Sequence, residues 1–440
     1  MPDYDSLLAR AEQAIELAKQ KGADSAWADA SRVRSLETHV REGKLERVQD
    51  NTSRGLSLRL FVAGRYSTHS TSDLEARRFS EFVGEAIELT RALQPDPHRH
   101  LSDPALYAGR CPGDLDLDDP RVSEIQPEAR LAWCEEMHAP ILGQNGLISV
   151  SSVVYDSQFQ TASASSNGFS DSWGATSVGM YTSVTLKDKG EARPADGMGV
   201  SSRRLDALLS PTWVGEEALR RARARLGSTK GPTVVAPMVV DPQAVGRLLG
   251  ALLGSANGGA IQQGQSFWKD KLGVQVVADK LSVVDDPLVR AGLGSRPYDG
   301  EGIAAKRMEL MQAGTLQNYY IDTYYGSKLG MPPTAGGSSN QIVALGSGDL
   351  AKQIADVGSG VYVTSWLGGN SDSTTGDFSF GIQGHMIEHG RVAGAVSEMN
   401  ISGNLLDLFS QLRAVGDDPW LHSSLRAPTF VFDGVQFSGK

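Results

Sequence analysis

Residues 376–409 read GDFSFGIQGHMIEHGRVAGAVSEMNISGNLLDLF and contain the clearest structural pattern of the chain. Phe378, Phe380 and Ile382 alternate with small or polar residues, which is the period of a strand with one buried face. His389-Gly390 then supplies turn residues before a second apolar run. The block therefore predicts two strands joined by a hairpin turn.

The same block contains a pattern found in some zinc peptidases, H-x-x-E-H, at His385, Glu388 and His389. On a helix the two histidines would share one face and could bind one ion. On a strand they would lie about 13 Å apart, too far to share a metal. Because glycines, each costing a helix about 1 kcal/mol, recur through this block, we interpret the pattern as accidental. A metal site at these three residues is retained as an alternative.

Length and composition favour an α+β protein of two domains. A chain of 440 residues exceeds one ordinary core, and its hydrophobic fraction of 40% is ample for burial. A polar, glycine-bearing segment at 226–232 indicates the boundary, which divides the chain into domains 1–228 and 229–440. We expect each domain to be rich in antiparallel sheet with packed helices.

Charge and the amino terminus exclude several classes of function. The net charge of −10 gives no electrostatic footprint for nucleic acid or an anionic membrane. The first residues lack a basic region and a continuous apolar stretch, so they predict an ordinary helix and neither a signal peptide nor a membrane span. A cytoplasmic protein is expected.

Periodicity in the N-terminal half predicts an antiparallel meander between helices. A long amphipathic helix is expected over 74–93, a hairpin turn at Asn167-Gly168, and another helix over about 202–225. The predicted strands of the meander are 25–30, 36–41, 45–52, 55–62 and 64–70.

The second domain opens with an apolar strand, 233–240, that leads into Asp241-Pro242. Asp at the N-cap with Pro at the first helical position is a strong helix-start signal. Leu248, Leu249 and Leu252 then form part of the apolar face of a buried helix.

Several motifs of the second half occur together and in one order. They are Ser266-Phe-Trp-Lys-Asp-Lys-Leu-Gly273, Val283-Val-Asp-Asp-Pro287, Gly294-Ser-Arg-Pro-Tyr-Asp-Gly-Glu-Gly302 and the block from Gly376. In these motifs the chain resembles the TldD/PmbA family of peptidase subunits, closely from about 233 to 439 and more loosely before. The resemblance implies a TldD/PmbA-like fold.

Catalytic TldD-type members carry an H-E-x-x-x-H motif, usually HEAVGH, where this chain has Pro242-Gln243-Ala-Val-Gly-Arg247. Proline has no donor atom, arginine stays protonated, and glutamine cannot take a proton from water. The family's third ligand, a cysteine near the C terminus, is also missing between 415 and 428. The chain therefore resembles the TldE (PmbA) branch, which implies that zinc is bound by a TldD-type partner and not by this chain.

Asp299 and Glu301 flank a glycine and could serve acid–base chemistry. A tight turn, in which glycine takes positive φ and Asp299 accepts backbone hydrogen bonds, explains them better. With Arg247, they are kept as candidates for contacting peptide or lining a chamber.

Three hypotheses of function remain. The first is a non-catalytic subunit of a TldD/TldE metallopeptidase that trims or degrades small or unfolded peptides, homodimeric when alone. The second is a homo-oligomeric protein that binds peptides without cleaving them. The third is a self-sufficient hydrolase that uses His385, Glu388 and His389.

Overall fold

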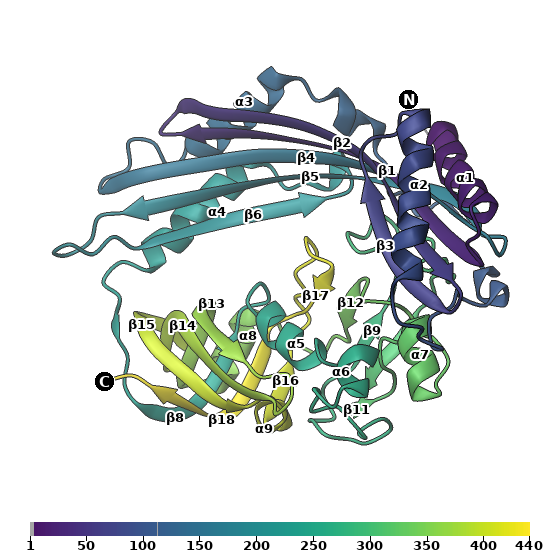
Figure 1. Ribbon diagram of the computed structural model, residues 1–440. Helices are drawn as coiled ribbons and strands as arrows, with labels where there is room; N and C mark the ends of the chain where they lie inside the picture. The colour runs from purple at the N-terminus through teal and green to yellow at the C-terminus, as the bar shows by residue number, and fades with distance from the viewer. Residues whose placement is uncertain (1–3, 112) are drawn as a thin grey trace.

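A long antiparallel sheet forms the N-terminal half of the protein, in the strand order β3-β2-β1-β4-β5-β6 (Figure 1). The computed structural model describes residues 4–111 and 113–440. The strands of this sheet are β1 Ser25–Arg41, β2 Lys44–Val62, β3 Arg65–Thr71, β4 Leu147–Ser165, β5 Ser170–Leu186 and β6 Ala195–Ser202. Residues 166–169 join β4 to β5, so the turn predicted at Asn167-Gly168 is confirmed.

Strands β1 and β2 are each continuous, whereas the sequence predicted two shorter strands in place of each. Their pairing runs from Ser25 opposite Phe61 to Arg41 opposite Lys44, with one register shift. The break predicted in β1, at residues 31–35, falls in a half-buried part of the strand. The break predicted in β2 was wrong because residues 44–54 are almost entirely exposed. No apolar alternation marks that segment, although its backbone hydrogen bonds continue.

Four helices cover one face of this sheet. Ala26 and Ala28 of β1 pack in the core formed with the first helix pair, and Val40 packs in the core formed with the second. Because alternate residues of a strand share a face, both pairs lie on the same side. Figure 1 shows α1 and α2 at one end and α3 and α4 at the other. The helices are α1 Tyr4–Gln20, α2 Ala76–Arg91, α3 Pro127–His138 and α4 Pro211–Ala224.

Helix α4 is shorter than the helix predicted over 202–225. The residues before it form the edge strand β6, and a single 3-10 turn follows at Leu205–Ala207. The helix starts at Pro211 because the Ser210 side chain caps it, accepting a hydrogen bond from the backbone N–H of Trp213. Two further 3-10 turns, Pro104–Tyr107 and Pro120–Glu124, lie between α2 and α3.

The C-terminal half contains two sheets. The larger has the order β16-β18-β8-β13-β14-β15-β7, and β15 also pairs with β18, so five of its strands close on themselves. Its strands are β7 Thr229–Lys230, β8 Val234–Val240, β13 Gly360–Ser371, β14 Asp377–Glu388, β15 Arg391–Asn404, β16 Leu412–Val415 and β18 Phe430–Ser438. The smaller sheet contains β9 Val283–Asp285, β10 Met308–Gln312, β11 Thr315–Leu316, β12 Gln341–Val343 and β17 Leu425–Arg426.

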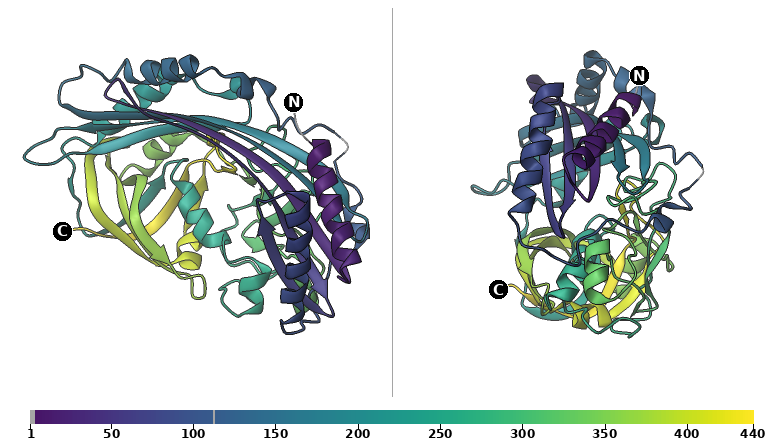
Figure 2. Two further views of the ribbon diagram at one scale, coloured as in Figure 1. Left: turned by 45° about the horizontal axis from the view of Figure 1, so that its top comes forward. Right: turned by 45° about the vertical axis from the view of Figure 1, so that its right-hand side comes forward.

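Helices of the C-terminal half are short and pack around these sheets (Figure 2). They are α5 Val245–Leu253, α6 Gly258–Gln262, α7 Thr323–Leu329, α8 Leu350–Val357 and α9 Leu405–Ser410. The architecture is α+β, as predicted. The division of the chain at residues 228 and 229 stays a prediction, and the six-stranded sheet ends at 202 while the other sheets begin at 229.

The hairpin predicted from residues 376–409 is confirmed. Strands β14 and β15 pair along their length, and the turn between them places His389 and Gly390 at φ of 51° and 71°. Gly384 packs so closely on β13 that a Cβ atom there would overlap the Tyr362 carbonyl. The H-x-x-E-H pattern therefore lies on a strand and its turn, not on a helix.

Helix α5 begins at Val245, three residues after the start that Asp241-Pro242 predicted. Residues 242–244 form a turn instead, in which the Asp241 carboxylate accepts a hydrogen bond from the Gln243 N–H. The apolar face is as expected, with Leu248, Leu249 and Leu252 fully buried in the main core. Among the described residues, no helix is both long and apolar enough to cross a membrane.

Two substitutions in α5 test this packing. Leu249→Ala should lower the free energy of unfolding by about 2–5 kcal/mol, because it removes a fully buried side chain from the core. Gly250→Ala on the exposed face should raise it by about 0.5–1 kcal/mol, because an added Cβ meets no atom within 4 Å. Urea unfolding followed by circular dichroism measures both. Equal effects of the two changes would contradict the assigned orientation of the helix.

Candidate functional site

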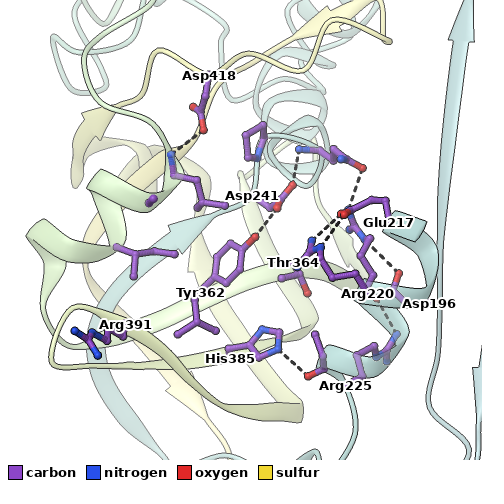
Figure 3. A pocket seen from close by; sticks show the side chains of 18 of the residues that line it. Asp196, Glu217, Arg220, Arg225, Asp241, Tyr362, Thr364, His385, Arg391 and Asp418 are labelled. Atoms are coloured by element: carbon purple, nitrogen blue, oxygen red, sulfur yellow. Dashed lines mark hydrogen bonds and ion pairs between the residues drawn. The ribbon is translucent and has the colours of Figure 1, made fainter. Parts of the chain in front are cut away.

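A cavity of about 660 Å³ lies at the junction of the two halves of the chain (Figure 3). Helix α4 forms one wall, and the other lining residues come from β6, the β8–α5 turn, β13, β14, the start of β15, helix α8 and residues 418–420. We call it the Asp241 cavity, after the residue at the end of β8. Its walls come from segments that are far apart in the sequence.

Asp241 is held by the pairing of β8 with β13. Its N–H donates to the Val363 carbonyl at 3.0 Å, and its carboxylate accepts the Tyr362 hydroxyl at 2.5 Å and the Gln243 N–H at 2.9 Å. Burial, together with the adjacent carboxylate, raises the pKa of the Tyr362 phenol above its usual range. Tyr362 is therefore a neutral donor, and both oxygens of Asp241 are already engaged.

His385 on β14 lies beside Tyr362, with their ring centroids 6.0 Å apart. Its Nε2 is 2.9 Å from the Ala224 carbonyl, which can only accept, so Nε2 carries the proton. Burial lowers the pKa of His385, and the nearby Arg220 and Arg225 lower it further. The neutral ring leaves Nδ1 as a buried acceptor with no partner among the described residues.

Arginines from the end of α4 line the opposite wall. Arg220 makes a two-pronged pair with Glu217, at 2.7 and 2.6 Å. Arg221 and Arg225 both approach the Asp196 carboxylate of β6, each at 3.6 Å. Burial lowers the pKa of Arg225, although Asp196 partly compensates.

The residues that replace the H-E-x-x-x-H motif do not gather at one point. Pro242 and Gln243 line the Asp241 cavity, where the Gln243 side chain accepts a hydrogen bond from Arg221 at 3.1 Å. Arg247 is exposed on α5, its guanidinium 4.7 Å from the centre of the Phe380 ring, and it donates to the Gly369 carbonyl.

The alternative metal residues are also separated. His385 is buried and lines the cavity, whereas Glu388 and His389 are exposed at the end of β14 and in the turn. Within residues 4–111 and 113–440, no group of three or more His, Cys, Asp or Glu side chains is placed to hold a metal ion. The donor set around Asp241 therefore does not fit a zinc site.

Asp299 and Glu301 lie outside the Asp241 cavity, in a cleft lined also by Arg59 and Arg99. Asp299 accepts hydrogen bonds from the N–H groups of Glu301 and Ile303, as predicted for a tight turn. The predicted positive φ is found at Gly302, at 78°, and not at Gly300. Glu301 accepts two hydrogen bonds from Thr323, and burial raises the pKa of its carboxyl.

This second cleft lies at another contact between the two halves. Arg59 of β2 bonds the Asp29 carboxylate and donates to the Gly300 carbonyl. Trp27 of β1 stacks on Phe169, which packs against Tyr298. The Gly300 carbonyl thus meets the N-terminal half, whereas the carboxylates of Asp299 and Glu301 are occupied by hydrogen bonds within the C-terminal half.

Sequence reasoning missed the charged wall and the histidine acceptor. The run Leu-Arg-Arg-Ala-Arg-Ala-Arg at 219–225 was a usable signal, because it places several cations on one helix end with few carboxylates nearby in sequence. No sequence signal links it to Tyr362 or His385, since the fold alone brings them together.

Comparison with known proteins places the chain in a family. Three family models match in order: PmbA/TldA metallopeptidase domain 1 at 29–90, the central domain at 120–226 and the C-terminal domain at 233–439. The chain belongs to the PmbA/TldD metallopeptidase family. The first two models divide the six-stranded sheet between them, because they contain β1–β3 and β4–β6 respectively.

Full-length similarity is to PmbA-type members. Metalloprotease PmbA of Escherichia coli O157:H7 is 27% identical over 431 residues, which are 97% of this chain and 95% of that protein. A TldD homologue of Haemophilus influenzae is 26% identical over only 227 residues, which are 48% of this chain and 47% of that protein.

Solved structures of the same fold cover almost the whole chain. A Bacteroides thetaiotaomicron protein named "putative modulator of DNA gyrase" is 36% identical, covers 98% of both chains and has a TM-score of 0.95. TldE from Thermococcus kodakarensis, 18% identical, covers 98% of this chain and 100% of its own with a TM-score of 0.87, which shows the shared fold.

The depressed pKa of His385 makes stability depend on pH. The buried ring resists protonation in the folded protein, while the unfolded chain takes up a proton near pH 6.5. The contribution of His385 to the free energy of unfolding should therefore be complete above about pH 6.5 and be lost as the pH falls toward the pKa of His385 in the folded protein. Urea unfolding at pH 7.5 and 5.5 measures the free energy of unfolding, which should fall less between the two pH values in His385→Asn than in the wild type. An equal drop would show that His385 titrates alike in both states.

Proposed function

We propose that this chain is the non-catalytic, TldE/PmbA-type subunit of a cytoplasmic TldD/TldE metallopeptidase complex that trims or degrades small or unfolded peptides. The observation that carries the proposal is the chemistry at the H-E-x-x-x-H position. Pro242, Gln243 and Arg247 offer neither a metal ligand nor a general base there.

The surroundings of these residues support a binding role more than a catalytic one. Asp241, the nearest carboxylate, already accepts two hydrogen bonds, and His385 has its Nε2 fixed on a backbone carbonyl. Two histidines can bind one metal ion only where their donor nitrogens lie within about 4 Å of each other, because each metal–nitrogen bond is about 2 Å long. The strand geometry at His385 and His389 does not offer this. Zinc is therefore assigned to the partner subunit.

The scaffold around the replaced motif is nevertheless intact. Helix α5 keeps its apolar face, β8 keeps its place in the closed sheet, and the turn between them lines a cavity. A chain that keeps a peptidase scaffold without its metal ligands is best explained as one part of a paired assembly. We propose pairing through the C-terminal half, with a homodimer when the chain is alone.

Mixing and metal analysis test this proposal. The isolated chain should contain no stoichiometric zinc and cleave no peptide. Co-expression with the TldD-type chain of the same genome should give a stable complex on sizing, with an interface of at least about 1,000 Å², and faster cleavage of an unfolded peptide than the partner gives alone.

Two results would contradict the proposal in different ways. One zinc per isolated chain, lost in His385→Ala or His389→Ala, would favour the self-sufficient hydrolase. Absence of a complex, with no effect on the partner's cleavage, would favour the homo-oligomeric peptide-binding protein.

A further inference from the structure

We propose that the Asp241 cavity binds the free C-terminal carboxylate of a short peptide, with Arg221 and Arg225 as the recognising cations. This inference rests on the proposed function, since it names the binding site and the peptide end that the subunit recognises. It assigns a role to side chains that neither the lost motif nor the scaffold explains.

The first argument is an imbalance of charge and hydrogen bonds on the α4 wall. Arg221 and Arg225 share one carboxylate, Asp196, at 3.6 Å, and their side chains are only 11% and 19% exposed. A guanidinium has five N–H donors. Among the described residues, the recorded hydrogen bonds use one from each arginine, to the Gln243 side chain and to the Ala195 carbonyl.

Partly buried cations of this kind favour an incoming anion. Desolvation of a charge costs free energy unless a counter-charge and hydrogen bonds compensate for it. The lowered pKa of Arg225 agrees, because burial there outweighs the attraction of Asp196. A carboxylate matches the planar fork of a guanidinium and supplies the missing acceptors.

The α4 wall of the cavity favours a singly charged anion. The whole lining carries four arginines and four carboxylates. On the α4 wall, Arg220 pairs with Glu217, while Arg221 and Arg225 share Asp196, so one guanidinium there has no carboxylate of its own. Asp241 is bonded to Tyr362, and Asp418 accepts hydrogen bonds from Leu350 N–H and Thr429. A phosphate dianion would add more negative charge than that one guanidinium can balance.

Apolar side chains also line the cavity. Leu350 and Ile354 of α8, with Val392 and Trp420, line the same cavity. His385 lines the same cavity. Figure 3 shows Tyr362 and His385 between Arg391 on one side and Arg220 and Arg225 on the other.

Size agrees with a short peptide. A volume of about 660 Å³ lies within the roughly 300–1,000 Å³ typical of small-ligand sites. An apolar or aromatic last residue can pack on these apolar side chains while its carboxylate contacts the arginines. The cavity thus offers cations for the carboxylate and apolar contacts for the last side chain of a peptide.

Calorimetric titration of the full-length chain tests the proposal directly. The probes are N-acetylated Ala-Ala-Phe with a free carboxylate, the same peptide as its C-terminal amide, and inorganic phosphate. The free acid should bind at least tenfold more tightly than the amide and than phosphate. This contrast needs no variant, so it stands even where a substitution disturbs folding.

Variants then test whether Arg221 and Arg225 contact the carboxylate. Arg221→Gln and Arg225→Gln should each weaken binding of the free acid at least tenfold and leave binding of the amide unchanged. Arg223→Gln is the matched control, because Arg223 lies on the same helix, is exposed and does not line the cavity. The proposal would be overturned if acid and amide bound equally, if phosphate bound more tightly, or if the acid did not bind at millimolar concentration. It would also be overturned if all three variants lost the same affinity for the acid.

The two proposals can fail separately. If the acid does not bind while the chain still forms a complex with the TldD-type partner and raises its cleavage, the subunit role stands and only this binding site is wrong. If the acid binds with the expected preference but no complex forms, the carboxylate site stands and the chain is a peptide-binding protein.

Discussion

The register between β8 and β13 determines the geometry of the candidate site. These strands pair in parallel, with Tyr362 opposite Val239 and Val363 opposite Val240. The register brings Asp241 beside both β13 residues, one accepting its N–H and the other donating to its carboxylate. β18 pairs with the other edge of β8, so the strand is fixed on both sides. A shift of one residue would turn Tyr362 to the other face.

The cavity also depends on the packing of α4 from the N-terminal half. The C-terminal half supplies Asp241, Tyr362 and His385, whereas the N-terminal half supplies Asp196 and the arginines at the end of α4. The contacts that join the halves include the α4 wall here and the Trp27 and Arg59 region that meets Tyr298 and Gly300. Neither half alone contains a complete set of lining groups.

Local patterns predicted local structure well. The alternation at Phe378, Phe380 and Ile382 was sufficient for the hairpin, and glycine content separated strand from helix at the H-x-x-E-H pattern. Periodicity failed on β2, because an extended strand leaves no apolar alternation where both faces are exposed. The capping signal Asp241-Pro242 misplaced the start of α5, because the Asp241 carboxylate is shared between Tyr362 and the Gln243 N–H. The cavity was unpredictable for a stronger reason, since its residues meet only through long-range sheet pairing.

Closure of the larger C-terminal sheet limits where another strand can add. In the described N-terminal sheet the outermost strands are β3 and β6, and an unpaired edge is a template for foreign strands. On β6, the Arg225 guanidinium donates to the Ala195 carbonyl, an acceptor that an added strand would otherwise use. The Arg225 side chain, which lines the cavity, thus also occupies a carbonyl at the edge of the sheet and hinders pairing with a foreign strand there. A bound peptide would then contact Arg225 through its terminal carboxylate and would not add a strand beside β6.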